Sequence, residues 1–566
     1  MDDPNPRPRL AFAPRLTLLV MLGPVAAGLW GTLLPAFGHL PAAGAWGPSL
    51  GPLRMLFAWP GLGAAVRLSL TTGLLATLLS LAIVTLLAAG WAGTRPFRLL
   101  ERALAPFLSV PHAAVAFGLA FLIAPSGWLA RLASPWLTGW SKPPDLLILN
   151  DPAGLALTAG LVAKEVPFLL LMTLVALGQS DGTRGLRVAQ ALGHGRVSGW
   201  LKAVFPRVYP QIRLPVYVVL AYSMTVVDAA LILGPTTPPP LAVQVLTWMD
   251  DPDLTRRLTA AAGAVLQTLL VAGALLLWRG AEMAVAALGR RWIEAGGRGR
   301  AEPVLRALGL AAAGLCAAAV TAGLAGLAVW SVAGFWGFPD ALPQGITAET
   351  WMRLGPGLGR AAATTALVAL AATGIALLLA VLCLEAEDRT ARRMGPRGLW
   401  LLYLPLIVPQ VAFLPGVQML LLDLGAHAGP VPVVAVHLVF VLPYVFLSLG
   451  GPWRALDPRI GRVAAALGAG RWRVLWAVRL PMLLRPVLTA AAVGLAVSVG
   501  QYLPTLLAGG GRVVTLTTEA VALASGGDRR AIGAYGLAQT AAALLPFAVA
   551  TLLPALLWRN RRTLNG

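Results

Sequence analysis

RVAQALGHGRVSGWLKAVFP, at residues 187–206, recurs as RVAAALGAGRWRVLWAVRLP at residues 462–481, with a constant offset of 275. Nine of the 20 aligned positions are identical, among them the first glycine of each copy, Gly193 and Gly468. Both copies are basic, and both interrupt long apolar runs. A hydrophobic chain that carries one short charged segment twice, in the same setting, is predicted to consist of two like halves.

The composition indicates a membrane protein. Of the 566 residues, 58% are hydrophobic and 12% are charged, and the mean hydropathy is +0.76. A soluble domain carries about 25% charged residues. Apolar runs of about 20 residues recur, and a helix of that length crosses a hydrocarbon core of about 30 Å. We therefore predict an all-α polytopic membrane protein.

Twelve transmembrane helices are predicted, arranged as two repeats of six. The first six predicted spans cover residues 14–37, 64–90, 103–124, 153–178, 214–234 and 258–278, and the second six cover 307–330, 361–384, 399–423, 431–450, 486–508 and 533–557. We expect residues 1–290 to form the first repeat, 291–303 a cytoplasmic linker and 304–566 the second repeat. An even number of spans per repeat makes the two repeats parallel.

The distribution of positive charge predicts the orientation. The formal net charge is +21, but the basic residues fall in loops between apolar runs, which favours a membrane protein over a nucleic-acid-binding one. With the amino terminus inside, the cytoplasmic segments hold 32 Lys and Arg residues and the outer segments hold 11. Cytoplasmic loops are enriched in Lys and Arg. We expect both termini and both repeated segments in the cytoplasm of a bacterial cell, with the chain in its inner membrane.

The repeated segment reads as a short amphipathic helix. Val197, Trp200 and Leu201 fall on one apolar stripe at helical spacing. Gly193 permits a sharp turn before this helix, and Pro206 ends it. One interpretation is a helix that lies among lipid headgroups. The duplication and the fixed spacing favour a second interpretation, in which a soluble partner docks on two equivalent sites.

The segment resembles the EAA loop of binding-protein-dependent ABC importer permeases. That loop has a Glu-Ala-Ala start, a glycine three residues later and a Leu-Pro pair thirteen residues beyond the glycine. This chain has Gly193 followed by Pro206, and Gly468 followed by Pro481, at that spacing. It departs at the start, where Arg187 and Arg462 stand in place of the glutamate.

The resemblance covers both halves, and the chain as a whole is similar to the fused ferric-iron and thiamine permeases. It implies two copies of a cytoplasmic ABC ATPase, a periplasmic solute-binding protein and an import function. It also implies that the repeated segments couple to the ATPase. The residues expected there are Arg187, Ala189, Gly193, Trp200, Leu201, Phe205, Pro206, Arg462, Ala464, Gly468, Trp472, Trp476, Leu480 and Pro481.

The chain has no phosphate-binding loop of its own. No Gly-Lys dipeptide occurs in the sequence, so the pattern G-x-x-x-x-G-K-[ST] is absent. We therefore expect a transport subunit and no enzyme, with no bound cofactor and no metal, and with ATP and Mg used by the partner ATPase. The alternatives are an ion-driven secondary transporter with 6+6 repeats and, more remotely, a membrane enzyme.

Ionisable and polar residues inside spans are candidates for the translocation pathway, because they are costly to bury in a membrane. Lys164 and Glu165 lie in the fourth span and Asp228 in the fifth, while Gln501 and Tyr502 occupy the matching region of the second half. For Lys164 and Glu165, the alternative is an ion pair buried against another helix. The substrate is not readable from these residues, although thiamine or a related small organic solute is favoured over ferric iron.

Overall fold

The computed structural model describes residue 10 and residues 12–180, 182–299, 302–390, 393–426 and 429–557. Most of these residues are helical. The strands among them are β1 (His39–Leu40) and β2 (Ala45–Trp46), which pair as a short antiparallel hairpin. The prediction of an all-α membrane protein is confirmed.

The helices before the junction of the halves follow the predicted order of spans. They are α1 (Ala13–Ala36), the 3-10 turn η1 (Pro41–Ala43), α2 (Gly51–Ala58), α3 (Leu62–Trp91), α4 (Arg95–Ser109), α5 (His112–Ile123), α6 (Trp128–Ala133), α7 (Leu155–Gln179), α8 (Gly182–Ala191), α9 (Arg196–Ala203), α10 (Phe205–Thr225), α11 (Asp228–Leu233), α12 (Leu241–Met249) and α13 (Arg256–Glu294).

The second half repeats this order. Its helices are α14 (Glu302–Ser331), α15 (Glu349–Thr390), α16 (Pro396–Ile407), α17 (Gln410–Asp423), α18 (Pro430–Ala455), α19 (Pro458–Ala466), α20 (Arg471–Arg473), the π-helix η2 (Val474–Arg479), α21 (Leu480–Met482), α22 (Leu484–Val499), α23 (Leu503–Ala508), α24 (Leu516–Leu523), the 3-10 turn η3 (Ala524–Gly526) and α25 (Arg529–Leu557). Between the halves, α13 ends at Glu294 and α14 begins at Glu302, both inside the linker expected at 291–303.

Several predicted spans are broken helices. In the described part of the chain, nine helices are long and apolar enough to cross a membrane, or eleven if each of two bent pairs counts as one span. One such pair bends by 85° between α16 and α17, at Pro409, because proline cannot continue the backbone hydrogen bonding of a helix. The predicted span 214–234 is divided between α10 and α11, and is not among these eleven.

A buried glutamine braces the break in the fifth span of each half. Gln267 Nε2 donates to the carbonyl oxygen of Met224, 3.1 Å away, near the end of α10. Gln539 Nε2 donates to Thr517 Oγ1 at 2.7 Å, and that hydroxyl donates to the carbonyl oxygen of Val499. Met224 and Val499 are equivalent at the offset of 275. Backbone groups freed by a helix break inside a membrane require such partners. In both halves a glutamine side chain takes part in supplying the partner.

The first helix of each half packs on the other half. In α1, a Cβ added to Gly31 would lie 2.9 Å from the carbonyl oxygen of Gly416 in α17. In α14, a Cβ added to Gly323 would lie 2.8 Å from the backbone of Gly118 in α5. Glycine at such crossings lets two helix backbones approach closely. The two halves are therefore interlocked and do not pack as separate bundles.

We expect Gly323→Ala to destabilise the protein by about 1–3 kcal/mol, because the added methyl group overpacks the contact with α5. Gly314→Ala is the matched control in the same helix, since a Cβ there has no neighbour within 4 Å and alanine favours a helix by about 1 kcal/mol. Thermal unfolding midpoints of the purified variants measure the difference. Equal midpoints for the two variants would contradict this account of the crossing.

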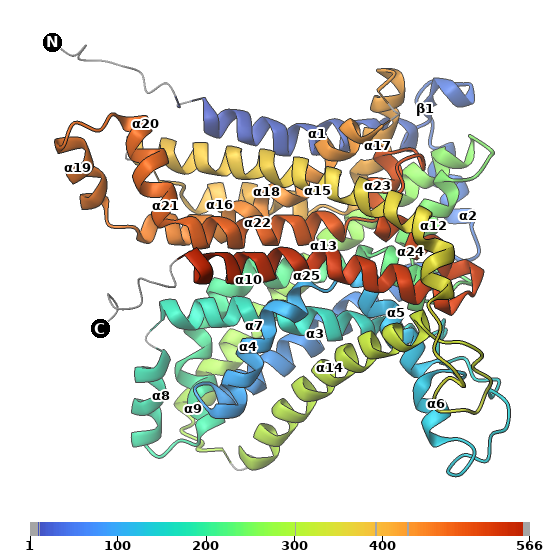
Figure 1. Ribbon diagram of the computed structural model, residues 1–566, viewed down its shortest axis with the longest axis horizontal. Coiled ribbons are helices and arrows are strands. Elements are labelled where there is room, and N and C mark those ends of the chain that lie inside the picture. Colours follow the sequence, from blue (N-terminus) through green and yellow to red (C-terminus); the bar gives the residue numbers. More distant parts are fainter. Residues whose placement is uncertain are drawn as a thin grey trace.

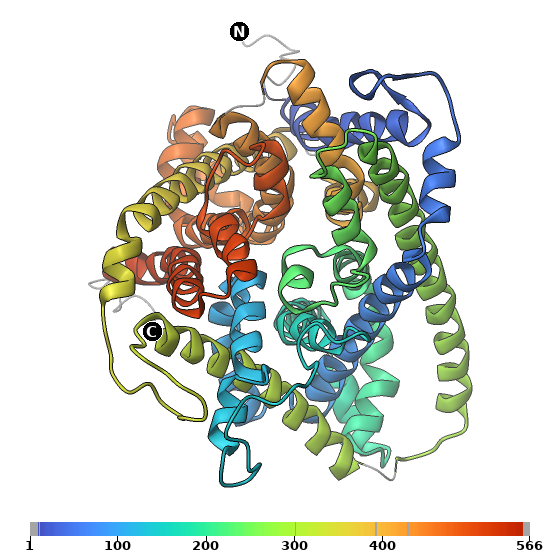
Figure 2. The same ribbon diagram turned by 90° about the vertical axis from the view of Figure 1, so that its right-hand side faces the viewer.

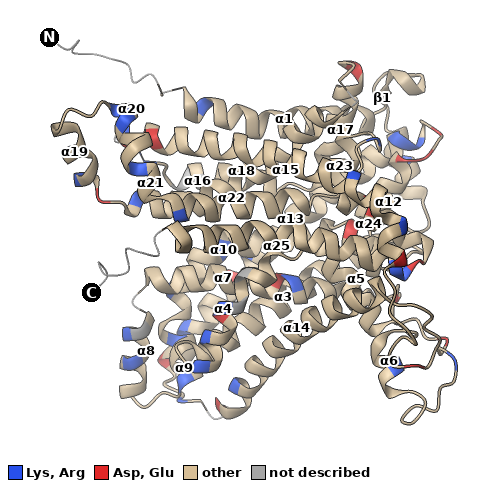
Figure 3. Ribbon diagram, in the orientation of Figure 1, with Lys and Arg blue, Asp and Glu red and all other residues tan. Residues whose placement is uncertain are grey.

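Both repeated segments lie at the same end of the molecule. Figure 1 places α8, α9, α19 and α20 together at one end, where α1 also begins and α25 ends. Lys and Arg residues gather at this end (Figure 3). Seen along the helices from the other end, the second half lies largely to one side of the first (Figure 2). The two copies of the segment thus lie on one basic face (residues 182–206 and 458–482). We call it the coupling face, after the role that the resemblance implies for these segments.

Candidate functional site

The repeated segment folds into the same helix–turn–helix twice. The turn after α8 holds Gly193 at φ +83°, and the turn after α19 holds Gly468 at φ +85°. This left-handed conformation favours glycine. In each copy, the residue after the glycine donates its backbone N–H to a carbonyl five residues earlier, that of Ala189 or Ala464, at 3.1 and 3.0 Å. The equivalence predicted from the sequence is therefore geometric as well.

The apolar stripe of the first copy faces the protein interior. Trp200 is 2% exposed, and Val197 and Val204 are also buried. The Trp200 ring lies 6.0 Å from the ring of Phe205, centroid to centroid. Trp200 was expected at the surface that couples to a partner, but in this structure it anchors α9 to the protein. An amphipathic pattern does not reveal whether the apolar face meets the chain's own core or another protein.

In both copies, exposed apolar side chains also lie one helix earlier. In α8, Val188 is 56% exposed and Leu192, just beyond its end, is 67% exposed. Their equivalents at the offset of 275, Val463 and Leu467, are 59% and 84% exposed. Sequence reasoning missed them, although all four belong to identical positions of the repeat. Two matching apolar pairs at i, i+4 spacing thus stand on one basic face.

The second copy is the more open of the two. Trp472 and Trp476 are exposed, and the guanidinium of Arg389 lies 4.8 Å from the Trp472 ring. The other residues expected at the coupling face range from buried to exposed. Ala189 is buried, Leu201, Phe205, Ala464 and Leu480 are half-buried, and Arg187, Gly193, Pro206, Arg462, Gly468 and Pro481 are exposed.

Ion pairs hold the second copy to the end of α15. Arg479 Nη1 lies 2.7 Å from Glu385 Oε2 and 2.8 Å from Asp388 Oδ2. Glu385 also pairs with Arg389 at 2.7 Å. Val204 occupies the position of Arg479 in the first copy, so this network has no counterpart there.

Lys164 satisfies the backbone at the end of α4. Its ammonium donates to the carbonyl oxygens of Phe107, Leu108 and Val110 at 3.3, 2.8 and 2.6 Å. These carbonyls lack helical partners because α4 ends beside Pro111. Although Lys164 and Glu165 are adjacent in the sequence, the structure gives them different partners.

Glu165 belongs to a polar cluster between the halves. Its carboxylate lies 3.3 Å from His112 Nε2, and the His112 ring lies 4.7 Å from the ring of Tyr222. Asp228, buried at the start of α11, lies within electrostatic range of His112 and Tyr222. Tyr444 of the second half lies within electrostatic range of Glu165. Helices α5, α7, α10, α11 and α18 thus converge here.

The cluster contains residues that the sequence did not single out. His112, Tyr222 and Tyr444 join Glu165 and Asp228. The sequence does hold one clue to His112, which directly follows Pro111 at the start of a new helix. A polar side chain at a helix break inside a span can reach the neighbouring helices. Tyr502, which was predicted, lies within electrostatic range of Asp228.

The second half offers neutral groups at its own break. Gln501 and Tyr502 occupy the break between α22 and α23 and are half-buried. Nearby, His437 Nδ1 lies 2.8 Å from Ser498 Oγ and His437 Nε2 lies 2.9 Å from Thr505 Oγ1. The polar centre is therefore asymmetric, with both carboxylates on the first half.

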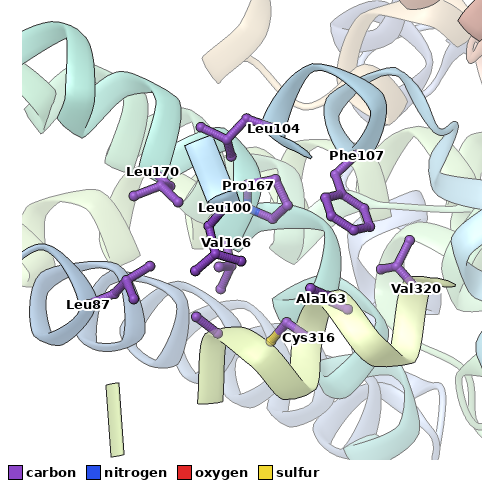
Figure 4. Close-up of a pocket in the computed structure, with 12 residues that line it drawn as sticks. Leu87, Leu100, Leu104, Phe107, Ala163, Val166, Pro167, Leu170, Cys316 and Val320 are labelled. Carbon is purple, nitrogen blue, oxygen red and sulfur yellow. The ribbon is translucent and has the colours of Figure 1, made fainter. Parts of the chain in front are cut away.

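Two cavities can be described, and neither is lined by a residue of this polar cluster. Figure 4 shows a gap of about 30 Å³ among α3, α4, α7 and α14, lined by apolar side chains such as Leu104, Phe107 and Val320 together with the thiol of Cys316. It offers a solute no polar contact. At the end opposite the coupling face, a larger cavity of about 570 Å³ is lined by Arg360, Arg512 and other residues of the second half. Among the described residues, no group of three metal-ligating side chains occurs.

Two like halves of membrane-spanning helices, with one helix–turn–helix repeated on a common face and a polar centre between the halves, define a membrane transport permease. Residues 391–562 match the family described as "Binding-protein-dependent transport system inner membrane component". The chain is 32% identical over 554 residues to the inner membrane ABC transporter permease protein YnjC of Escherichia coli (strain K12), a match that covers 95% of this chain and 97% of that protein.

A shorter match is to the molybdenum transport system permease protein ModB of Mycobacterium tuberculosis (strain ATCC 25618 / H37Rv), which is 32% identical over 160 residues, 27% of this chain and 59% of ModB. No solved structure matches the chain. The chain belongs to the ABC transporter permeases of binding-protein-dependent import, and it is a multi-pass inner-membrane protein with a fused two-repeat architecture. Membership implies an ATPase and a periplasmic binding protein as partners.

Proposed function

We propose that this permease imports a small solute through the space between its halves, driven by two ATPase copies that dock on the coupling face. The observation that carries this proposal is the pair of identical, exposed apolar pairs, Val188 with Leu192 and Val463 with Leu467. Amphipathic helices that dock in grooves use apolar residues at i, i+4 spacing as anchors. The partner hydrolyses ATP with Mg, and the permease itself contributes no catalytic group or cofactor.

The orientation belongs to the same proposal. The coupling face and both termini are cytoplasmic, residues 1–290 and 304–566 are the two repeats, and the binding protein delivers its solute at the opposite end. The charge bias of 32 to 11 and the gathering of basic residues at the coupling face support this orientation.

For the solute, we propose a small positively charged molecule. Glu165 and Asp228 place carboxylates at the polar centre, and Tyr222, Tyr444 and Tyr502 add aromatic rings, which attract cations through their faces. Thiamine carries a positive charge and an aromatic framework and suits this centre, and ferric iron shares the charge alone. The molybdenum named in ModB's title supports no assignment for this chain, because the match covers about a quarter of it.

Co-purification with a partner ABC ATPase tests the proposal. We expect Leu192→Glu combined with Leu467→Glu to weaken the complex about 100-fold or more, because each buried leucine contributes about 1.5–3 kcal/mol. Leu342→Glu is the control, since Leu342 is an exposed leucine outside the coupling face. If the double variant retains the ATPase as the unmodified protein does, these apolar pairs do not carry the docking and the proposal fails.

A further inference from the structure

The two copies of the repeated segment are held in place by different means. The second copy is tied to α15 by Arg479 and its two carboxylates. In the first copy, where Val204 stands in place of Arg479, the chain that joins the two halves covers α9 instead. The residues that do so, Trp292, Gly297, Arg298 and Glu302, are all within the described part of the chain.

Glu302 caps α9 from the other half. One carboxylate oxygen accepts from the backbone N–H of Val197 at 2.6 Å, and the other accepts from the N–H of Ser198 at 2.8 Å. These donors belong to the first turn of α9, whose N–H groups have no partner within the helix. A carboxylate there also favours the helix dipole. Since Glu302 is the first residue of α14, the first helix of the second half is bonded directly to the segment of the first.

The rest of the junction adds contacts along the same helix. Ser198 Oγ donates to the carbonyl oxygen of Arg298 at 2.9 Å, and the Gly195 N–H donates to the same oxygen at 3.3 Å. Lys202 Nζ donates to the carbonyl oxygen of Gly297 at 2.7 Å and lies 4.6 Å from the centre of the Trp292 ring. The junction therefore holds both ends of α9.

The start of α14 is in turn fixed to α3. Trp91 Nε1 donates to the carbonyl oxygen of Arg306 at 2.8 Å, and the Arg306 guanidinium lies 4.9 Å from the Trp91 ring. Arg196 donates to the carbonyl oxygen of Ala92. Burial lowers the pKa of the Arg196 guanidinium below its ordinary value, and the charge of Arg306 lowers it further. Glu302 supplies negative charge to this otherwise cationic junction.

We propose that the junction between the halves is a working part of the coupling face, with Glu302 as the positioning residue for α8 and α9. A displacement of the first segment is then passed to α14, which packs on α5 of the first half and continues into the second. Among the described residues, the ion pairs of the second segment run to α15 instead. The two docking sites for the ATPase are therefore inequivalent. We call the contacts between the junction and α9 the clamp. Its role in transport rests on the proposed function, but its existence does not.

Spin labels at Val188→Cys and at Val463→Cys, each in a Cys316→Ala/Cys383→Ala background, report on the two segments without any partner. We expect Glu302→Ala to raise the mobile population at position 188 about fivefold, as for the loss of one helix cap, with little change at position 463. Arg479→Ala is expected to do the reverse. Glu294→Ala, an exposed carboxylate at the end of α13, is the control and leaves both labels unchanged.

A second measurement separates positioning from simple stability. In the reconstituted complex, Glu302→Ala is expected to retain the ATPase but lower the stimulation of ATP hydrolysis by the binding protein, and Glu302→Gln, which keeps an acceptor oxygen, is expected to restore part of it. Equal responses of the two labels to Glu302→Ala, or normal stimulation in that variant, would overturn the inference. Failure of the unmodified permease to bind the ATPase would instead overturn the proposed function, while the label experiment would still decide whether the clamp exists.

Discussion

Lys164→Met is expected to remove most of the folded protein, because the buried ammonium of Lys164 is shared by three backbone carbonyls at the end of α4. A hydrogen bond to a charged group contributes about 1.5–3 kcal/mol, and a buried acceptor left without a partner adds its desolvation penalty. Methionine matches the length of lysine but offers no donor. The expected loss of at least about 3 kcal/mol is a large share of the stability of a typical protein.

The measurement is the yield of monodisperse protein and its thermal midpoint in detergent. Lys142→Met, at an exposed position in the loop before α7, is the control and should behave as the unmodified protein does. A Lys164→Met variant that is fully stable but does not transport would reverse the assignment. Lys164 would then act in the translocation pathway, as the sequence alone allowed.

Lys164 also illustrates the limit of sequence reasoning for this fold. A lysine next to a glutamate in an apolar run suggests an ion pair, but its acceptors are carbonyls 54 to 57 residues earlier. The helix break that exposes them follows from Pro111 and could be anticipated. Which side chain would reach those carbonyls depends on the packing of α7 against α4, and no local pattern encodes it.

The predicted features that hold up are those that hydropathy and repetition encode directly. Long apolar runs are sufficient for membrane-spanning helices, and the shared turns at Gly193 and Gly468 follow from the residue type that left-handed backbone requires. The break within span 214–234 was missed, because hydropathy continues unchanged across Val226 and Val227. The packing of α1 and α14 on the opposite halves was also missed. A glycine in a sequence can indicate a close helix crossing, but it does not indicate which helix lies across from it.

Burial was the least predictable property of the coupling face. Trp200 and Val188 are both apolar residues on amphipathic helices, yet one is buried and the other is exposed. The difference arises because α9 is covered by α3, α10 and the junction, whereas α8 stands outside them. Tertiary packing alone decides which of two similar stripes remains free for a partner.

Asp228→Asn and Glu165→Gln, made together, are expected to lower uptake of thiamine, the solute proposed above, by about tenfold or more. Two charges about 4 Å apart interact by about 4 kcal/mol at an effective dielectric constant of 20, so even part of this attraction gives a factor of this size. Both replacements keep the shape of the side chain. The protein should therefore fold and bind its ATPase as before, and the loss should appear in transport.

Uptake of labelled thiamine into vesicles that contain the permease, the ATPase and the binding protein provides the measurement, with Asp251→Asn as the control because Asp251 lies at a solvated loop outside the polar cluster. Normal uptake by the double variant would mean that both carboxylates have structural roles only. Glu165 would then serve as the partner of His112, and Asp228 would serve at the start of α11. Accelerated uptake of an anion would show that the negative centre is a barrier and that the proposed charge of the solute is wrong. A tenfold loss with intact ATPase binding would place the solute beside these carboxylates. Intact binding shows that the variant still assembles, so the lost negative charge must act on the solute as it passes.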